Sequence, residues 1–173
     1  FEAAGLPPGS VIAVQLPNTI EHALTLLAAW RAGLIVALLP QLWRHAELTD
    51  ALNRVGARAI VGASRIEIVD HADLAMNAAA EAFSIRHVFG FGTNLPEGMT
   101  PLDPAIVAGS DTVPAPVWDA RKAAIVSFDV TADGLIAVPR SHVSVIAGGL
   151  AVFLESGVPQ GARLMSAVLP SSF

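Results

Sequence analysis

The 173-residue chain contains no cysteine and only one lysine, Lys122. It can therefore form neither disulfide bonds nor thiolate metal sites, although this absence fixes no cellular compartment. Fifteen acidic residues outnumber ten lysines and arginines, and the formal net charge is −5. Proteins that bind nucleic acid carry a concentrated basic patch. Because the arginines of this chain are scattered, we expect no nucleic-acid partner.

Charged residues are scarce as well. They make up 14% of the chain, against 53% hydrophobic residues, and the mean hydropathy is +0.58. A free soluble domain carries about 25% charged residues. Either the chain crosses a membrane, or further protein covers its faces. A membrane-spanning helix needs about 20 mostly apolar residues, and Arg31 and Gly33 interrupt the best candidate, residues 23–39. We expect no membrane span, and we expect covered faces.

The two ends of the sequence favour the same interpretation. The chain begins at Phe1 rather than at a methionine, and it stops at Phe173 directly after an apolar run. We expect both ends to be cuts and residues 1–173 to be part of a larger domain, with the rest of the same polypeptide as a partner. The composition does not set an oligomeric state.

Short apolar runs alternate with segments of helical periodicity. Turn residues separate the runs, several of which are rich in β-branched residues, so they predict strands at 11–16, 34–39, 58–61, 86–91, 123–128 and 163–169. Helices are predicted at 18–33, 45–55, 64–82 and 141–155, the first and third from a capping-box spacing. The first carries apolar residues at helical spacing, which predict its core-facing side: Ile20, Ala23, Leu24, Leu27 and Trp30. Residues 92–120 are rich in glycine and proline and predict a long surface loop. This alternation predicts an α/β fold with a mostly parallel sheet and helices on both faces.

The most informative segment is residues 127–142, SFDVTADGLIAVPRSH. It follows a predicted buried strand and leads through a glycine-containing loop into a helix. Nucleotide-binding α/β proteins place their phosphate-holding loop at such a point. Here the loop contains no lysine and carries two aspartates, Asp129 and Asp133.

Residues 9–40, GSVIAVQLPNTIEHALTLLAAWRAGLIVALLP, resemble the opening of the AMP-forming acyl-CoA synthetases of the adenylate-forming superfamily. The shared features are a Gly-x-Val strand, a Leu-Pro-Asn turn and an Arg-Ala-Gly helix end. The resemblance implies that residues 1–173 are the N-terminal part of the large AMP-binding domain. For the parent protein it implies activation of a carboxylic (fatty) acid by ATP with Mg²⁺, transfer to CoA with release of AMP, and a cytoplasmic location. The fragment alone is expected to be inactive.

The family's phosphate loop usually reads Thr-Ser-Gly-Thr-Thr-Gly, one further residue, then Pro-Lys-Gly. Residues 129–138 occupy its place, and the Ser141-His142 pair matches a common family ending. Of the loop residues, only Thr131 and Gly134 keep family-like chemistry. The resemblance therefore implies Thr131 and Gly134 as weak phosphate contacts, in a degenerate loop, and no catalytic residue in this chain.

The two aspartates leave two interpretations open. They are either turn residues of a glycine-bearing loop or ligands of a Mg²⁺ ion shared with phosphates. A carboxylate about 4 Å from a phosphate oxygen costs about 1 kcal/mol in bulk water and about 4 kcal/mol at an effective dielectric of 20. Asp129 and Asp133 would thus oppose ATP without a cation. The parent is either a working ligase or a non-catalytic module of the same fold that binds an acyl group or a protein partner.

Overall fold

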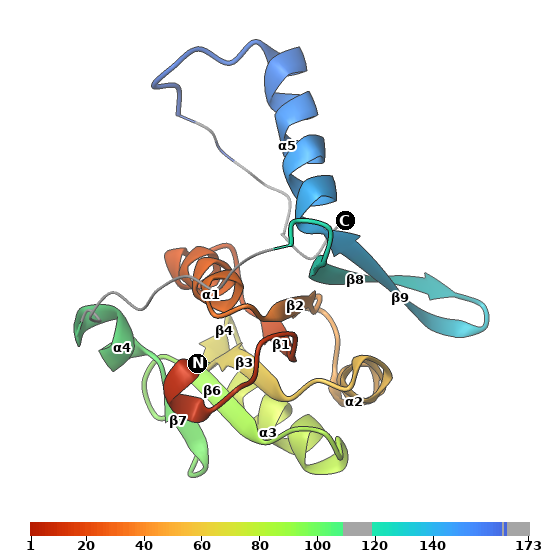
Figure 1. Cartoon of the computed structure of the whole chain (residues 1–173). Helices are drawn as coiled ribbons and strands as arrows, with labels where there is room; N and C mark the ends of the chain where they lie inside the picture. The colour runs from red at the N-terminus through yellow and green to blue at the C-terminus, as the bar shows by residue number, and fades with distance from the viewer. Residues whose placement is uncertain (109–118, 164, 166–173) are drawn as a thin grey trace.

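The computed structural model describes residues 1–108, 119–163 and 165 (Figure 1). The predicted strand at 163–169 lies largely outside these residues. A short 3₁₀ helix at Glu2–Ala4 precedes the regular elements, which are β1 (Val11–Gln15), α1 (Ile20–Arg31), β2 (Ile35–Leu38), α2 (His45–Val55), β3 (Ala59–Ala63), β4 (Arg65–Ile66), β5 (Val69–Asp70), α3 (His71–Glu81), β6 (His87–Phe91), β7 (Met99–Pro101), α4 (Asp103–Ala108), β8 (Ala123–Thr131), β9 (Gly134–Ser141) and α5 (His142–Ser156).

Seven strands form one sheet in the order β7-β6-β3-β1-β2-β8-β9. All neighbouring pairs are parallel except β8 and β9, which pair antiparallel. Strands β4 and β5 form a separate antiparallel pair. Helix α1 covers one face of the sheet, and α2 and α3 cover the other (Figure 1). The predicted α/β class, with a mostly parallel sheet and helices on both faces, is confirmed.

Two hydrophobic clusters fill the spaces between the sheet and its helices. Along β1, Ile12 and Val14 belong to the cluster beneath α1, whereas Ala13 belongs to the cluster beneath α2 and α3. All three are at most 1% exposed. Strands that are buried on both faces read as continuous apolar runs, and for this reason the inner strands were predictable from composition.

The buried face of α1 differs from the predicted one. The helical spacing of apolar residues indicated a face that includes Ile20 and Leu27, yet these side chains are 66% and 60% exposed. The residues that α1 buries are His22, Thr25 and Ala29. Apolar residues lie on more than one side of this helix, so its period predicts the helix but does not select the face that meets the sheet.

The predicted core position of Trp30 is supported by its contacts. Its ring packs against the cluster beneath α1, and Nε1 donates a hydrogen bond to the backbone carbonyl of Ala124 at 3.0 Å. Trp30 therefore joins the C-terminal end of α1 to the start of β8. A partly buried indole N–H commonly finds such a partner.

Two predicted helix starts were wrong in detail. Helix α1 begins after Thr19 rather than after Asn18. The Ser64–Glu67 spacing predicted a capping box, but the chain there forms the β4–β5 pair, with Glu67 at φ 53° in its turn. Helix α3 begins later, where the Asp70 side chain accepts a hydrogen bond from the backbone N–H of Asp73.

The segment predicted as a long surface loop, residues 92–120, contains regular structure. Strand β7 pairs in parallel with β6, and α4 follows it. These elements have three and six residues. Neither is long enough to produce a recognisable hydrophobic period, so glycine and proline content dominated the prediction.

Helix α5 extends away from the sheet (Figure 1). It begins as predicted at Ser141, whose side chain accepts a hydrogen bond from the backbone N–H of Ser144. The helix has no buried residue. Its exposed apolar side chains are Val143, Ile146, Leu150, Val152, Phe153 and Leu154. In the part of the chain that the structure describes, no helix combines the length and apolar content needed to cross a bilayer.

A buried polar network joins three elements at the carboxyl end of β1. Gln15 donates Nε2 to the carbonyl oxygens of Pro40 and Trp43, at 2.9 and 3.3 Å. Its Oε1 lies 3.0 Å from Nδ1 of His71, the first residue of α3. Because an amide oxygen only accepts, Nδ1 of His71 carries the proton. Gln15 and His71 are 1% and 2% exposed, and burial lowers the pKa of His71.

This lowered pKa predicts an acid-sensitive stability. The unfolded chain protonates His71 near pH 6.5, whereas the folded chain resists protonation until a lower pH. The contribution of His71 to stability is therefore complete above about pH 6.5 and is lost as the pH falls towards the folded-state pKa. We expect the free energy of unfolding to decrease between pH 7.5 and 5.5, and to decrease less in His71→Gln.

Urea titrations at both pH values measure this difference. At pH 7.5, where His71 is neutral in both states, the difference in unfolding free energy between wild type and His71→Gln measures the loss of the hydrogen bond alone. His22, whose pKa burial also lowers, keeps part of the pH dependence in the variant. An unchanged slope in His71→Gln would contradict the assignment.

Candidate functional site

Strand β8 leads out of the parallel sheet into a hairpin. It pairs in parallel with β2 through Ile125 and Val126. It then continues to Thr131 and pairs antiparallel with β9 along its length. Residues 129–138, predicted as a loop before a helix, are thus the outer part of a β-hairpin (Figure 1). The prediction of a strand feeding this segment is confirmed, and the prediction of an extended loop is wrong.

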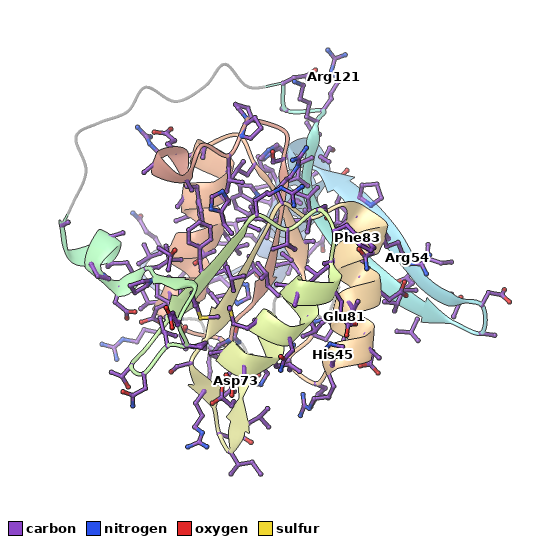
Figure 2. All side chains as sticks on the ribbon, turned by 90° about the horizontal axis from the view of Figure 1, so that it is seen from below. His45, Arg54, Asp73, Glu81, Phe83 and Arg121 are labelled. Atoms are coloured by element: carbon purple, nitrogen blue, oxygen red, sulfur yellow. The ribbon has the colours of Figure 1, made fainter. Side chains whose placement is uncertain are left out.

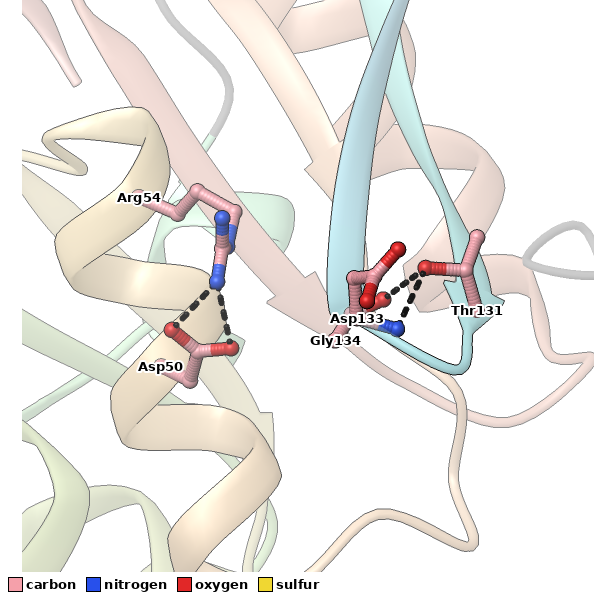
Figure 3. Close-up of polar contacts among 5 residues, drawn as sticks. All are labelled: Asp50, Arg54, Thr131, Asp133 and Gly134. Atoms are coloured by element: carbon pink, nitrogen blue, oxygen red, sulfur yellow. Dashed lines mark hydrogen bonds and ion pairs between the residues drawn. The ribbon is translucent and has the colours of Figure 1, made fainter.

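The hairpin tip is a two-residue turn. Thr131 pairs with Gly134, leaving Ala132 and Asp133 between them. Gly134 has φ +110°, a conformation that L side chains rarely adopt. Oγ1 of Thr131 donates to the Gly134 carbonyl at 2.9 Å and accepts from the Asp133 N–H at 3.3 Å (Figure 3). The structure thus brings the two predicted phosphate contacts together, but their polar groups bond within the turn.

Hydrophobic packing holds the hairpin against α2. Leu135 is 8% exposed and joins the cluster that contains Leu52 of α2. On β8, the Phe128 ring meets Trp43 edge-on, with 5.4 Å between ring centroids. Since Trp43 lies just before α2, the hairpin has contacts near both ends of that helix. The position of the hairpin tip is therefore fixed by hydrophobic contacts of the hairpin with α2 and Trp43, as well as by the hydrogen bonds of the turn.

An arginine from α2 lies against the hairpin tip. Nη2 of Arg54 donates to both carboxylate oxygens of Asp50, each at 3.1 Å (Figure 3). A β-carbon built on Gly134 would lie 3.8 Å from the same Nη2. In the sequence, Asp50 and Arg54 read as an ordinary ion pair at helical spacing. Sequence reasoning missed Arg54 because only the folded hairpin brings it to the loop.

The two aspartates have different structural positions. Asp133 occupies the turn, which agrees with its interpretation as a turn residue. Asp129 instead lies within β8, opposite Ile136, so the turn interpretation was wrong for Asp129. Both side chains are exposed. Among the described residues, no group of three or more histidine, aspartate or glutamate side chains is arranged to hold a metal ion.

The chemistry of the tip fits a phosphate group only in part. Phosphate oxygens need N–H donors or cations, and Arg54 supplies a guanidinium beside Gly134. In the same turn, the exposed carboxylate of Asp133 would repel an anion. The turn itself offers few donors, because the Asp133 N–H and the Thr131 hydroxyl bond each other. A phosphate would therefore be held through Arg54 rather than by a backbone cradle.

Besides a cavity of about 360 Å³ between α3 and β6, two more cavities lie elsewhere in the described chain. One, of about 270 Å³, is mainly apolar; its lining includes Leu24, Ala28, Leu102 and Ile106. The other, of about 210 Å³, lies where β1, β3 and β6 end. Adjacent strands there connect to helices on opposite faces, a place where open α/β sheets often bind ligands. Its polar side chains are Thr19, Glu21, Ser64, Arg65 and Asp103.

Comparison with known proteins agrees with this architecture. The family model described as AMP-binding enzyme matches residues 1–121. A 2-hydroxy-7-methoxy-5-methyl-1-naphthoate–CoA ligase of Streptomyces carzinostaticus is 34% identical over 92 residues, 53% of this chain and 16% of the ligase. A long-chain-fatty-acid–CoA ligase of Salmonella typhimurium is 31% identical over 87 residues, 50% of this chain and 14% of the ligase.

A solved structure shares the fold. An acetoacetyl-CoA synthetase of Streptomyces lividans superposes with a TM-score of 0.84 at 18% sequence identity, covering 98% of this chain and 28% of the synthetase. The present chain thus corresponds to a minor part of the length of each of these proteins. Because the family model covers more than half of the chain, the protein belongs to the AMP-binding enzyme family.

Proposed function

We propose that this chain is the N-terminal part of an AMP-forming acid–CoA ligase. The observation that carries the proposal is the position of the β8–β9 hairpin. Strand β8, which pairs in parallel with β2, leads directly into the hairpin. The resemblance to acyl-CoA synthetases puts the phosphate loop at this point of the chain. The reaction joins a carboxylic acid to the AMP part of ATP with release of pyrophosphate. It then passes the acyl group to CoA with release of AMP.

The contribution of this chain is mainly structural. The sheet and its two helical layers hold the hairpin, and Thr131 and Gly134 shape the tip near the phosphates. No residue of the chain is assigned a catalytic role, and residues 1–173 alone do not complete the reaction. ATP, AMP and CoA are ligands of the whole protein, which acts in the cytoplasm on a carboxylic acid of the fatty-acid class.

The remainder of the same polypeptide is the proposed partner of α5. This helix carries apolar side chains around most of its circumference and has no buried residue, although Val145 in its first turn packs against the cluster beneath α1. On the hairpin, Val130 and Ile136 lie on opposite faces, and both are exposed, at 73% and 52%. Soluble proteins rarely leave this many large apolar side chains of one helix exposed to solvent. Helices that are hydrophobic on all sides are normally enclosed by protein.

A second candidate function is a non-catalytic module that binds an acyl group or a protein partner. The closed turn at the hairpin tip favours it, because the Thr131 hydroxyl and the Asp133 N–H, which could donate to a phosphate, are engaged within the turn. The absence of a lysine from the loop favours it as well. The architecture of the sheet does not distinguish between the ligase and the binding module, because both would have the same fold.

Pyrophosphate exchange distinguishes the two functions. The full-length gene product is incubated with ATP, Mg²⁺ and labelled pyrophosphate, together with carboxylic acids of increasing chain length. A ligase incorporates label into ATP only when an acid is present, whereas residues 1–173 alone incorporate none. Absence of acid-dependent exchange across the whole series would instead identify the binding module.

The role of Asp133 is tested by ATP titrations of the full-length protein with Mg²⁺ and with EDTA. A turn residue beside the phosphates only repels them, at a cost of about 1 kcal/mol at 4 Å in water. We therefore expect Asp133→Asn to tighten ATP binding roughly fivefold with or without Mg²⁺. Asp129→Asn, on the strand, is the matched comparison. Weaker binding of Asp133→Asn in Mg²⁺ alone would show that Asp133 is a metal ligand.

A further inference from the structure

We propose that Arg54 is the phosphate-binding cation of this chain and that it substitutes from α2 for a lysine that the hairpin does not contain. The inference rests on the proposed nucleotide chemistry and assigns one residue to it. Its structural basis is the short distance between Nη2 of Arg54 and Gly134. If residue 134 had a β-carbon, that atom would lie 3.8 Å from Nη2. The guanidinium thus lies within contact distance of the turn, where it can reach an anion bound over the tip.

The basic residues of the hairpin segment itself are badly placed for this role. Lys122 precedes β8, and Arg140 pairs with Ile125 at the base of the hairpin. From Ile125 to Thr131 the strand extends about 20 Å, at about 3.3 Å per residue. Neither basic residue thus stands near the tip. The positive charge that the structure brings to Gly134 comes from another element, α2.

Arg54 retains donors for a ligand while its position is fixed. A guanidinium carries five N–H donors in a planar fork, and the pair with Asp50 engages those on Nη2. The Arg54 side chain is 42% exposed and thus accessible. Packing of Leu135 against the cluster that contains Leu52 holds α2 and the hairpin together. The site is therefore formed before a ligand arrives, which suits two-point recognition of phosphate.

Asp50 makes the proposal distinguishable from a structural role. If Arg54 binds phosphate, the Asp50 carboxylate competes with the ligand for the same cation, and its removal strengthens binding. If Arg54 only joins Asp50 within the helix, removal of either partner affects stability, and neither change alters anion binding specifically. Surface pairs at this spacing contribute little to stability, so we expect both variants to remain folded.

The test uses the full-length protein and inorganic tripolyphosphate, without a carboxylic acid, in calorimetric titrations at low and moderate salt. Arg54→Ala should lower the affinity roughly tenfold or more, since charge-assisted hydrogen bonds are lost. Arg54→Lys should retain part of the affinity, and Asp50→Asn should increase it severalfold. Thermal unfolding of each variant verifies that the fold is intact.

Arg121→Ala is the matched control. Arg121 also pairs with a neighbouring aspartate, Asp119, at 3.2 Å, but its side chain is 89% exposed. It lies in a different part of the molecule from Arg54 (Figure 2). We expect its replacement to leave tripolyphosphate affinity unchanged. Equal losses of tripolyphosphate affinity in Arg54→Ala and Arg121→Ala would mean that binding depends only on the net charge of the protein. This result would overturn the proposal.

The remaining outcomes separate this inference from the ligase function. Wild-type affinity in Arg54→Ala, or absence of tripolyphosphate binding to the wild type at millimolar concentration, overturns the role of Arg54 even if acid-dependent exchange is present. Specific loss in Arg54→Ala without any exchange supports the anion site and rejects the ligase. Sulfate binding as tightly as tripolyphosphate would overturn the assignment to phosphates.

Discussion

Burial of β1 on both faces is the constraint on which the rest of the structure depends. The strand lies between β2 and β3, and its inner side chains alternate between two hydrophobic clusters. Each cluster needs its own helical layer, so α1 must lie on one face while α2 and α3 lie on the other. This arrangement gives α2 its position beneath the hairpin. At the carboxyl end of β1, Gln15 then joins the loop before α2 to the start of α3.

The inner strands and most helices were predictable because local sequence determines them. Residues 11–16 are almost entirely apolar, and Gly56, at φ +60°, ends α2 as expected for a left-handed C-terminal residue. The buried side of α1 was not predictable, because Leu27 is exposed although it is more apolar than His22, Thr25 and Ala29, which α1 buries. Only contact with the sheet decides which side faces inward.

The candidate site was only partly predictable for a related reason. Thr131 and Gly134 could be selected from the order of residues along the chain, and the structure brings them together. The extension of β8 beyond Phe128 depends on pairing with β9 and on burial of Leu135 against α2. The contact of Leu135 with Leu52 of α2 joins residues about 80 positions apart in sequence. A local sequence pattern does not indicate contacts between residues so far apart. Arg54 could not be selected from the sequence for the same reason.

The two outer strands of the described sheet share a feature with consequences for association. Strand β7 ends at Pro101, and β9 contains Pro139. A proline has no backbone N–H to donate, so each border of the sheet lacks one donor for an incoming strand. Natural proteins use such residues to discourage edge-to-edge polymerisation. A strand that added to either border would therefore form at least one backbone hydrogen bond fewer, which weakens edge-to-edge association between copies.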